Sequence, residues 1–515
     1  MAFLDQRERE LLEAISQLTY CNPFLGERID WERRALGEAF TPFFAVWHPR
    51  ADLLGNNPNV QRIAELAAGL AETLRGRLEA GAEASSAEIG LYRDLVLYLL
   101  YYRHQERFLA MILGDRSRTE RRRAGFYREF RVDFDRYLDL PPVPPAARAE
   151  PEHVFACFFQ VRRAFFYTFH SIAGSSMPAA RLRAQVWQSV FTHDLRRFQR
   201  SLYARMGEVT TLVTGPSGTG KELVARAIGL ARYIPFDPGE CCFREDYEES
   251  FFPLNLSALS PTLIESELFG HRRGAFTGAV ADRVGWLEVC PPLGTVFLDE
   301  IAEIDVAVQV KLLRVLETRT FQRLGATDDR RFRGKVIAAT NRDLGAEMRA
   351  GRFREDLYYR LCSDVILAPS LHERIADSPE ELPALALFLA QRLAGEDEAP
   401  ELAREVEAWI DRELGRDYPW PGNVRELAQC VSNVLIRREY RPAAAGGTAN
   451  AREELAREFA AGELSAEEVL RRYCTVVYAR AGSYQEAARR LGLDRRTVKS
   501  RVDPELLDEL QALTI

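Results

Sequence analysis

Four short apolar segments alternate with helical segments in the middle of this 515-residue chain. The four segments are residues 209–214, 252–256, 295–298 and 336–340. Near-continuous apolar strands separated by helices are typical of a parallel sheet covered by helices on both faces. Apolar residues recur at helical spacing from Val308 to Leu316, after Asp305 as a candidate N-cap, which predicts a crossover helix. The centre of the chain is therefore predicted to be an α/β domain.

The composition excludes several classes of protein. With 47% hydrophobic and 28% charged residues, the chain is neither disordered nor fibrous, and its length predicts about three domains. No apolar run approaches the roughly 18 residues of a membrane span, and the N-terminus becomes charged too early for a secretory signal. We therefore expect a soluble, cytoplasmic protein that does not bind membranes. Since the net charge is -7, any DNA binding requires a local basic patch.

Residues before the α/β region have a helical pattern. Ser85 to Glu88 form a capping box, and residues 59–78 carry helical periodicity. Five prolines in the twelve residues 140–151 predict an extended connector or hinge. Residues 442–450 consist mostly of alanine and glycine, which predicts a flexible linker to a small helical C-terminal domain.

A glycine-rich segment follows the first predicted strand and precedes a helix, which is the context of a phosphate-binding loop. Its glycines let backbone N–H groups turn toward phosphates, and Lys221 reaches the β- and γ-oxygens. Glu222 stands where the general pattern has Ser or Thr as a magnesium ligand. The predicted nucleotide-binding residues are Gly215, Pro216, Ser217, Gly218, Thr219, Gly220, Lys221 and Glu222.

Polar residues follow two later strands. Asp299 can hold magnesium at the tip of its strand, and the adjacent Glu300 can accept a proton from an attacking water. Asn341 ends the last strand and can sense the γ-phosphate, although a turn-forming asparagine explains it equally well. Together with the glycine-rich loop, these acids favour nucleotide hydrolysis.

From about residue 174 to 438, the sequence resembles the AAA+ domain of bacterial enhancer-binding proteins, the NtrC-like activators of sigma-54 RNA polymerase. The most specific element is an intact GAFTGA motif, preceded by ESELFGH at residues 265–271. Without the resemblance, two glycines around Phe and Thr indicate only a mobile loop tip with a packed Phe. With it, the loop is the expected contact with sigma-54, made by Gly274, Ala275, Phe276, Thr277, Gly278 and Ala279.

The resemblance implies roles for other residues. The segment GPSGTGKE is similar to the family's GESGTGKE, so Glu222 follows family usage. By the same resemblance, Asn255 restrains the catalytic Glu300, and Arg425 is a second sensor that contacts nucleotide in its own subunit. Arg354 and Arg360 match the segment that supplies arginine fingers to a neighbour's γ-phosphate. A guanidinium suits these roles because it pairs with phosphate oxygens bidentately and stays charged.

The C-terminal end predicts a helix-turn-helix. A capping box at Ser465 opens one helix, and two shorter helical segments follow around Gly492, the last with Asp494 as N-cap. This end is similar to the Fis-type DNA-binding domain of the same family. Residues 478–502 include seven basic and only two acidic residues, which gives a local basic patch that can bind phosphates. The predicted DNA contacts are Arg489, Arg490, Arg495, Arg496, Thr497, Lys499 and Arg501.

These observations give a multidomain prediction. An all-α N-terminal regulatory domain (1–172, hinge 141–151) precedes an α/β AAA+ P-loop domain with a parallel sheet (173–438, helical lid about 372–438). A linker (439–463) then leads to a small all-α helix-turn-helix domain (464–515).

The resemblance implies an activator that hydrolyses ATP with Mg²⁺, binds enhancer DNA and remodels sigma-54 RNA polymerase holoenzyme. A homo-hexamer is implied as its active form and a dimer as its inactive form. The alternative is an AAA+ DNA-binding regulator or remodeller that does not act through sigma-54. A P-loop metabolic kinase is less consistent, since it needs neither arginines acting between subunits nor a DNA-binding tail.

The N-terminal region gives less information about its role. It lacks the paired-acid first strand and alternating β/α pattern of a phosphoacceptor receiver domain. Its aromatic residues between Tyr98 and Phe169 can line a ligand pocket, but an all-helical core is the favoured interpretation. The signal it senses is left open.

Overall fold

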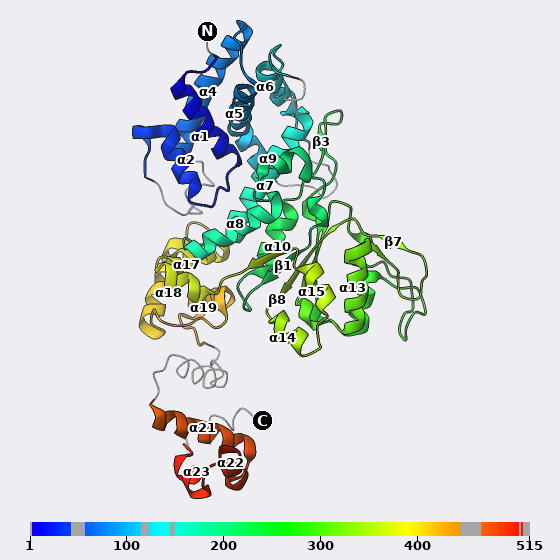
Figure 1. Ribbon diagram of the computed structural model, residues 1–515, viewed down its shortest axis with the longest axis vertical. Coiled ribbons are helices and arrows are strands. Elements are labelled where there is room, and N and C mark those ends of the chain that lie inside the picture. Colours follow the sequence, from blue (N-terminus) through cyan, green and yellow to red (C-terminus); the bar gives the residue numbers. More distant parts are fainter. Residues whose placement is uncertain are drawn as a thin grey trace. The chain divides into compact units, whose positions relative to one another are not determined.

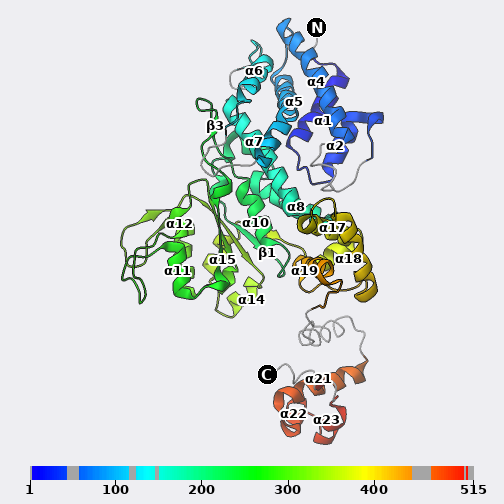
Figure 2. The same cartoon turned by 180° about the vertical axis from the view of Figure 1, so that it is seen from behind.

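The computed structural model describes residues 3–42, 57–114, 123–144, 150–442, 465–503 and 506–507 (Figures 1 and 2). The chain divides into two compact units, residues 1–431 and 432–515. The predicted linker lies mostly outside the described residues, as do residues 145–149 of the proline-rich segment. Within the described residues, no helix combines the length and the apolar character that a membrane crossing requires.

A five-stranded parallel sheet forms the centre of the first unit, in the order β4-β5-β8-β1-β9. The strands are β1 (Thr211–Thr214), β4 (Phe251–Asn255), β5 (Thr295–Asp299), β8 (Lys335–Thr340) and β9 (Asp364–Leu367). The first four confirm the predicted strands. The edge strand β9 was not predicted, although its residues from Val365 to Leu367 are all apolar, and two of them, Val365 and Leu367, are exposed.

Both faces of the inner strands β1, β5 and β8 are covered, so nearly all of their side chains are buried. Val213, Phe297 and Ile337 pack into a core shared with the N-terminal helices. Their neighbours Leu212, Leu298 and Ala338 point to a second core on the opposite face. The helices beside the sheet are α10 (Lys221–Leu230), α11 (Pro261–Phe269), α12 (Trp286–Val289), α13 (Val306–Thr318), α14 (Leu344–Arg349) and α15 (Glu355–Leu361).

The lid follows the sheet as four helices. They are α16 (Leu371–Asp377), α17 (Glu381–Ala394), α18 (Ala399–Glu413) and α19 (Asn423–Arg437). In the sheet domain, the Asp305 side chain accepts a hydrogen bond from Val308 N at 2.8 Å, so the predicted N-cap of α13 is confirmed.

The N-terminal region is all-helical, as predicted. Its helices are α1 (Gln6–Tyr20), α2 (Glu27–Leu36), α4 (Pro58–Glu79), α5 (Ser86–Leu113), α6 (Tyr127–Leu138) and α7 (Pro151–Ser171). Helix α8 (Met177–Phe191), the short α9 (Leu195–Arg197) and the π-helical turn η3 (Phe198–Leu202) then lead to β1. The capping box is confirmed, with Ser85 and Glu88 exchanging hydrogen bonds at the start of α5.

Helix α7 joins the N-terminal region to the helix that follows the glycine-rich loop (Figure 1). The buried Arg163 donates hydrogen bonds to the carbonyls of Leu230 (2.8 Å) and Arg232 (2.7 Å). Gln160 donates to the carbonyl of Ala231 at 3.0 Å. These carbonyls lie at the C-terminal end of α10, where a cation is favoured by the helix dipole. The N-terminal helices therefore contact α10 directly.

A hairpin in the central domain reinforces this contact. Strands β2 (Phe236–Asp237) and β3 (Cys242–Phe243) pair antiparallel in the segment 231–251, which follows α10. The ring of Phe236 lies 4.7 Å from that of Phe155, and Phe243 lies 4.3 Å from Phe159. The hairpin thus provides an aromatic docking surface for α7.

The lid holds the connection between α7 and α8. Arg374 and Glu381 form a fully buried ion pair, and Glu381 also accepts a hydrogen bond from Ser176 N at 2.8 Å. Arg374 donates to the carbonyl of Ala173. Gly174 has φ of 123°, and a Cβ there would lie 2.2 Å from Arg374 Nη2, so only glycine fits.

Replacing Glu381 with Ala is expected to destabilise the first unit strongly. The change leaves the Arg374 charge buried without its counterion, and breaking a buried pair costs about 3–5 kcal/mol. The measurement is the shift of the urea midpoint, followed by tryptophan fluorescence. Glu380→Ala is the matched control, because Glu380 is exposed. Equal midpoints for the two variants would contradict this account.

In the second unit, three helices follow the pattern predicted for the C-terminal end. They are α21 (Ala466–Ala481), α22 (Tyr484–Leu491) and α23 (Arg495–Arg501). Gly492 ends α22 with φ of 64°, and the Asp494 side chain caps α23 by accepting from Arg496 N at 2.7 Å. Cys474, Ala487 and Val498 are buried between the helices.

Candidate nucleotide site and exposed loop

The glycine-rich loop connects the carboxyl end of β1 to the N-terminus of α10. Gly215, Gly218 and Gly220 have φ of 141°, 79° and 90°, a conformation that side chains rarely allow. The Lys221 ammonium folds back onto the loop and donates to the carbonyls of Gly215 (3.0 Å) and Pro216 (3.1 Å). A cation and a helix N-terminus thus meet at one point, which is the arrangement that binds phosphate.

Burial sets the electrostatics of this site. Burial lowers the pKa of Lys221, and the charges of Glu300 and Asp299 oppose that shift. Burial also raises the pKa of Asp299, while a hydrogen bond from Glu300 N and the Lys221 charge act to lower it. The predicted acids and the lysine therefore lie within electrostatic reach of one another, at the carboxyl edge of the sheet.

Glu300 has a left-handed backbone, with φ of 55°. Its carboxylate accepts a hydrogen bond from the backbone N–H of Asn341 at 3.2 Å, so the ends of β5 and β8 meet here. The side-chain amide oxygen Oδ1 of Asn255 accepts hydrogen bonds from Ser257 N (3.0 Å) and Ser257 Oγ (2.8 Å). Asn255 pairs in register with Asp299, and its restraint of Glu300 stays a prediction.

The lid reaches the glycine-rich loop through two residues. Arg425 donates to Ser217 Oγ at 3.2 Å, so the structure brings the predicted sensor to the loop. Asn423 donates to the Ser217 carbonyl at 2.9 Å and accepts from Leu371 N at 2.8 Å. Sequence analysis gave Asn423 no role. The sequence signal for a role of Asn423 is its place in residues 420–426, WPGNVRE, two positions before Arg425.

The candidate arginine fingers pair with acids that are not part of this cluster. Arg354 pairs with Asp356 at 2.6 Å, and Arg360 pairs with Glu317 at 3.3 Å, with Arg360 more than half exposed. Gln309 is fully buried and accepts from Arg354 N at 2.8 Å, which fixes the start of α15. Sequence analysis did not identify Gln309. A glutamine on the apolar face of a helix was the signal that could have found it.

The GAFTGA residues form an exposed loop between α11 and α12. Gly274 donates to the Ala279 carbonyl at 2.8 Å, which closes the loop, and Thr277 is exposed. The Phe276 ring is half-buried and lies 5.0 Å from the ring of His271. Gly274 and Gly278 have positive φ and open space around them. The loop therefore presents Thr277 and its glycines to solvent.

A neighbouring loop supports its base. Arg272 N donates to the Leu324 carbonyl at 3.0 Å, and Leu324 N donates to the Gly270 carbonyl at 2.9 Å. Leu324 lies between strands β6 (Thr320–Phe321) and β7 (Arg330–Arg331). Asp282 accepts from Arg273 N at 2.8 Å on the other side. Sequence analysis missed this support, since backbone hydrogen bonds between distant loops leave no motif.

The predicted DNA contacts lie in the second unit on α22 and α23. Arg495, Arg496 and Lys499 are exposed on α23. Arg489 and Arg490 are exposed on α22 and pair with Glu486 at 2.8 and 3.0 Å. Thr497 and Arg501 are half-buried. The basic residues predicted from sequence therefore share one small helical unit.

Comparison with known proteins agrees with this geometry. Residues 190–366 match the family model described as "Sigma-54 interaction domain". The "Nif-specific regulatory protein" of Azotobacter vinelandii is 45% identical over 230 residues, which is 45% of this chain and 40% of that protein. "Transcriptional regulatory protein ZraR" of Escherichia coli is 43% identical over 235 residues, 45% of this chain and 49% of that protein. The matched region thus spans about half the length of these relatives or less.

Among solved structures, NtrX from Brucella abortus in complex with ATP has a TM-score of 0.39 and 23% sequence identity, over 69% of this chain and 73% of that one. The assignment does not depend on that similarity. It rests on the matched family model, on the sequence relatives and on the site described above. By these matches, residues 190–366 of this chain are similar to the Sigma-54 interaction domain, an AAA+ ATPase-type domain, and the relatives they resemble are NtrC-like sigma-54-dependent activators.

Proposed function

We propose that this chain is an ATP-hydrolysing activator that binds enhancer DNA and remodels sigma-54 RNA polymerase in the cytoplasm. The observation that carries the proposal is the intact GAFTGA loop, exposed and apart from the phosphate-binding residues. An AAA+ remodeller of another target would need the nucleotide site but not this loop sequence. The domains proposed are those expected from sequence, with residues 1–172 as the regulatory region.

The residues fit ATP as substrate. The glycine-rich loop offers backbone N–H groups at a helix N-terminus, and the Lys221 ammonium has only carbonyl partners in the loop. Phosphate oxygens can replace those carbonyls as acceptors, with a gain in charge pairing. Asp299 is the proposed ligand of Mg²⁺, and when bound the ion would neutralise charge on the β- and γ-phosphates. Arg425 lies on the Ser217 side of the loop, where it can contact nucleotide in its own subunit.

Glu300 is the proposed base for hydrolysis. Its carboxylate is half-buried at the carboxyl edge of the sheet and is oriented by Asn341 N. From that place it can accept a proton from the attacking water, a role in which a positioned carboxylate contributes about 10²–10⁴-fold in rate. Asn255, one strand away, is the proposed link between Glu300 and the rest of the domain.

The test of the proposal is binding to sigma-54 in the presence of a transition-state analogue of ATP. The analogue is needed because the loop is expected to be displayed only when the γ-phosphate is held as in the transition state. Binding with the analogue, together with opening of a sigma-54 promoter, is the expected result. If the intact protein shows no sigma-54 binding in the analogue state, the regulator that does not act through sigma-54 takes its place.

Arg354 and Arg360 are proposed to act on the nucleotide of a neighbouring subunit in a hexameric ring. ATP turnover should therefore rise more than linearly with protein concentration as rings form. Arg354→Ala and Arg360→Ala should each lower turnover by roughly a thousandfold, the lower range for arginine fingers. The measurement is steady-state phosphate release against concentration, with Arg349→Ala as an exposed control. Strictly linear turnover from a proven monomer would refute the assignment.

The second unit is proposed to bind enhancer DNA through α23 and the basic residues beside it. Truncation after Arg441 should leave ATP turnover intact and remove specific DNA binding. Affinity of the intact chain should fall steeply with salt, because each phosphate contact releases counterions. Footprinting on a selected site measures both effects, and the full chain with Arg495 and Arg496 replaced by Ala is the matched comparison. A footprint retained after truncation would place the DNA site elsewhere.

A further inference from the structure

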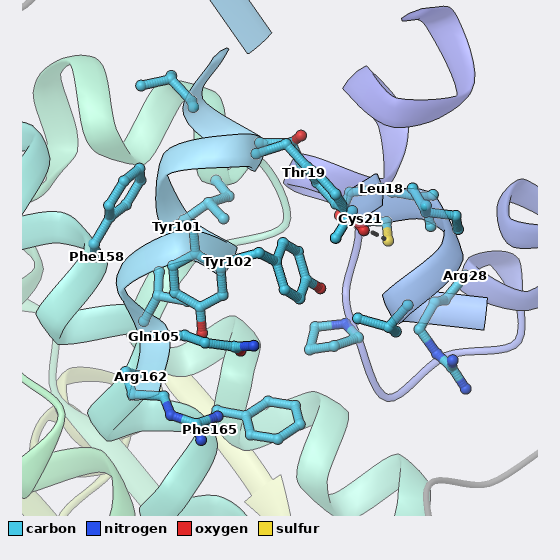
Figure 3. Close-up of a pocket in the computed structure, with 18 of the residues that line it drawn as sticks. Leu18, Thr19, Cys21, Arg28, Tyr101, Tyr102, Gln105, Phe158, Arg162 and Phe165 are labelled. Carbon is cyan, nitrogen blue, oxygen red and sulfur yellow. Dashed lines mark hydrogen bonds between the residues drawn. The ribbon is translucent and has the colours of Figure 1, made fainter. Parts of the chain in front are cut away.

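A cavity of about 240 Å³ lies inside the N-terminal region, between α1, α4, α5, α7 and the turn after α8 (Figure 3). Aromatic rings supply much of its wall, with Tyr101 and Tyr102 from α5 and Phe158 and Phe165 from α7. Trp187 of α8 completes the wall. An apolar cavity of about 150 Å³ is enough to hold benzene. This cavity therefore has room for a planar molecule of one or two rings.

One charged group in the wall lacks a full set of partners. Arg162 is 4% exposed, and its Nε has no hydrogen-bond partner among the described residues. Its ion-pair partner, Glu106, lies 4.0 Å away and is itself 68% exposed. The Tyr101 hydroxyl is its other polar neighbour. A buried cation with so distant a counterion is costly, so an anionic group in the cavity would stabilise it.

The second arginine of the cavity is already neutralised. Arg28 and Glu32 are both buried and form an ion pair at 2.5 Å. Among the charged residues that line the cavity, the balance is therefore one positive charge, at Arg162. The wall thus offers flat aromatic surfaces and a single cation.

Helix α7 connects this cavity to the ATPase core. Phe158, Arg162 and Phe165 recur at helical spacing and line the cavity on one face of α7. Gln160 and Arg163 point to the other side, where they hold the carbonyls at the end of α10. A molecule seated in the cavity would therefore contact the same helix that holds the phosphate-loop helix. Such a ligand can act on the ATPase only through a difference in affinity between two states.

We propose that this cavity binds an aromatic carboxylic acid, with its ring among the aromatic residues and its carboxylate on Arg162, and that binding changes ATP turnover through α7. The regulatory half of the proposal rests on the proposed ATPase function. The binding half does not, and it is tested without reference to turnover.

The binding test uses the full chain with 2-naphthoate and 2-naphthamide, two probes of the same shape that differ in charge. Calorimetry is expected to show naphthoate binding at least about tenfold tighter than the amide, the ratio for a charge-assisted hydrogen bond. Naphthoate is also expected to quench the fluorescence of Trp187, and Trp187→Phe should remove that change. Equal binding of the two probes, or no binding of naphthoate, would overturn the proposal.

Three variants locate the anion. Arg162→Gln should weaken the binding of naphthoate by at least about tenfold and leave the binding of the amide unchanged. Glu106 lies on the surface, and Glu106→Gln removes the carboxylate that competes for Arg162. This variant should therefore bind naphthoate up to about fivefold more tightly, and it can be tested even if the Arg162 variant folds poorly. Arg107→Gln, exposed on the same helix as Glu106, is the control and should change nothing. Wild-type affinity in both the Arg162 and Glu106 variants would place the anion elsewhere.

The regulatory half is read from ATP turnover with and without naphthoate. A change in the wild type that is absent in Arg162→Gln supports coupling through α7. Tight binding with unchanged turnover would overturn the coupling. If the wild type hydrolyses no ATP at all, the proposed function fails, while calorimetry still decides the ligand site.

Discussion

Lys221→Ala is expected to abolish tight ATP binding, with an affinity loss of at least about 100-fold. The substitution removes a buried cation from the β- and γ-phosphate oxygens and leaves only neutral N–H donors in the glycine-rich loop. Charge-assisted hydrogen bonds are worth about 1.5–3 kcal/mol each, and an ammonium can make several. Titration with a fluorescent ATP analogue measures the loss.

Two variants make this result specific. Glu300→Gln should bind ATP as tightly as the wild type and lose about 10²–10⁴-fold in turnover, because the amide cannot accept the proton of the attacking water. Lys311→Ala is the matched control, since Lys311 is exposed and pairs with Glu265 on the surface. Equal nucleotide affinity in Lys221→Ala and the wild type would contradict the assignment of the phosphate-binding loop.

Much of this site could be predicted because its signals are local. A glycine-rich turn between an apolar strand and a helix needs only adjacent residues, and Lys221 lies in the predicted place. The Asp305 and Ser85 caps were readable for the same reason, because a cap bonds to a residue three positions away. Strands β1, β4, β5 and β8 were predicted from short runs of apolar residues, many of which are buried in the two cores beside the sheet.

The rest depends on contacts between distant residues. Strand β9 was missed although Val365 to Leu367 are apolar, and its place at the edge of the sheet comes from pairing with β1, which is distant in the sequence. The docking of Arg163 on α10 joins residues 67 positions apart and has no sequence pattern. The predicted contact of Asn255 with Glu300 came from resemblance alone, and the hydrogen bonds of Asn255 in the structure go to Ser257.

The aromatic residues of the N-terminal region illustrate the same limit. From the sequence, a helical core was the favoured role for these residues and a ligand pocket the alternative. In the structure, helix α7 supplies both, with Phe155 and Phe159 fully buried in the core and Phe158 and Phe165 lining the cavity. Which ring takes which role depends on the direction each residue faces relative to other helices, and composition alone does not specify it.

Thr277→Ala is expected to separate ATP hydrolysis from the action on sigma-54. Thr277 is exposed at the tip of a loop closed by the Gly274–Ala279 hydrogen bond, and no catalytic group contacts it in the described residues. Its methyl and hydroxyl are therefore free to contact a partner protein. The variant should keep most ATP turnover and ring assembly. It should lose sigma-54 binding in the transition-state analogue complex and fail to open a sigma-54 promoter.

The comparison that decides the point is between two Thr→Ala variants. Thr318→Ala makes the same chemical change on an exposed residue of α13, outside the GAFTGA loop, and should behave as the wild type in all four measurements. If Thr277→Ala instead lowers turnover as much as promoter opening, the loop serves hydrolysis rather than a partner. If it opens promoters normally, sigma-54 contact must come from another surface. Only the loss of coupling with turnover retained fits a residue that transmits the energy of hydrolysis without generating it.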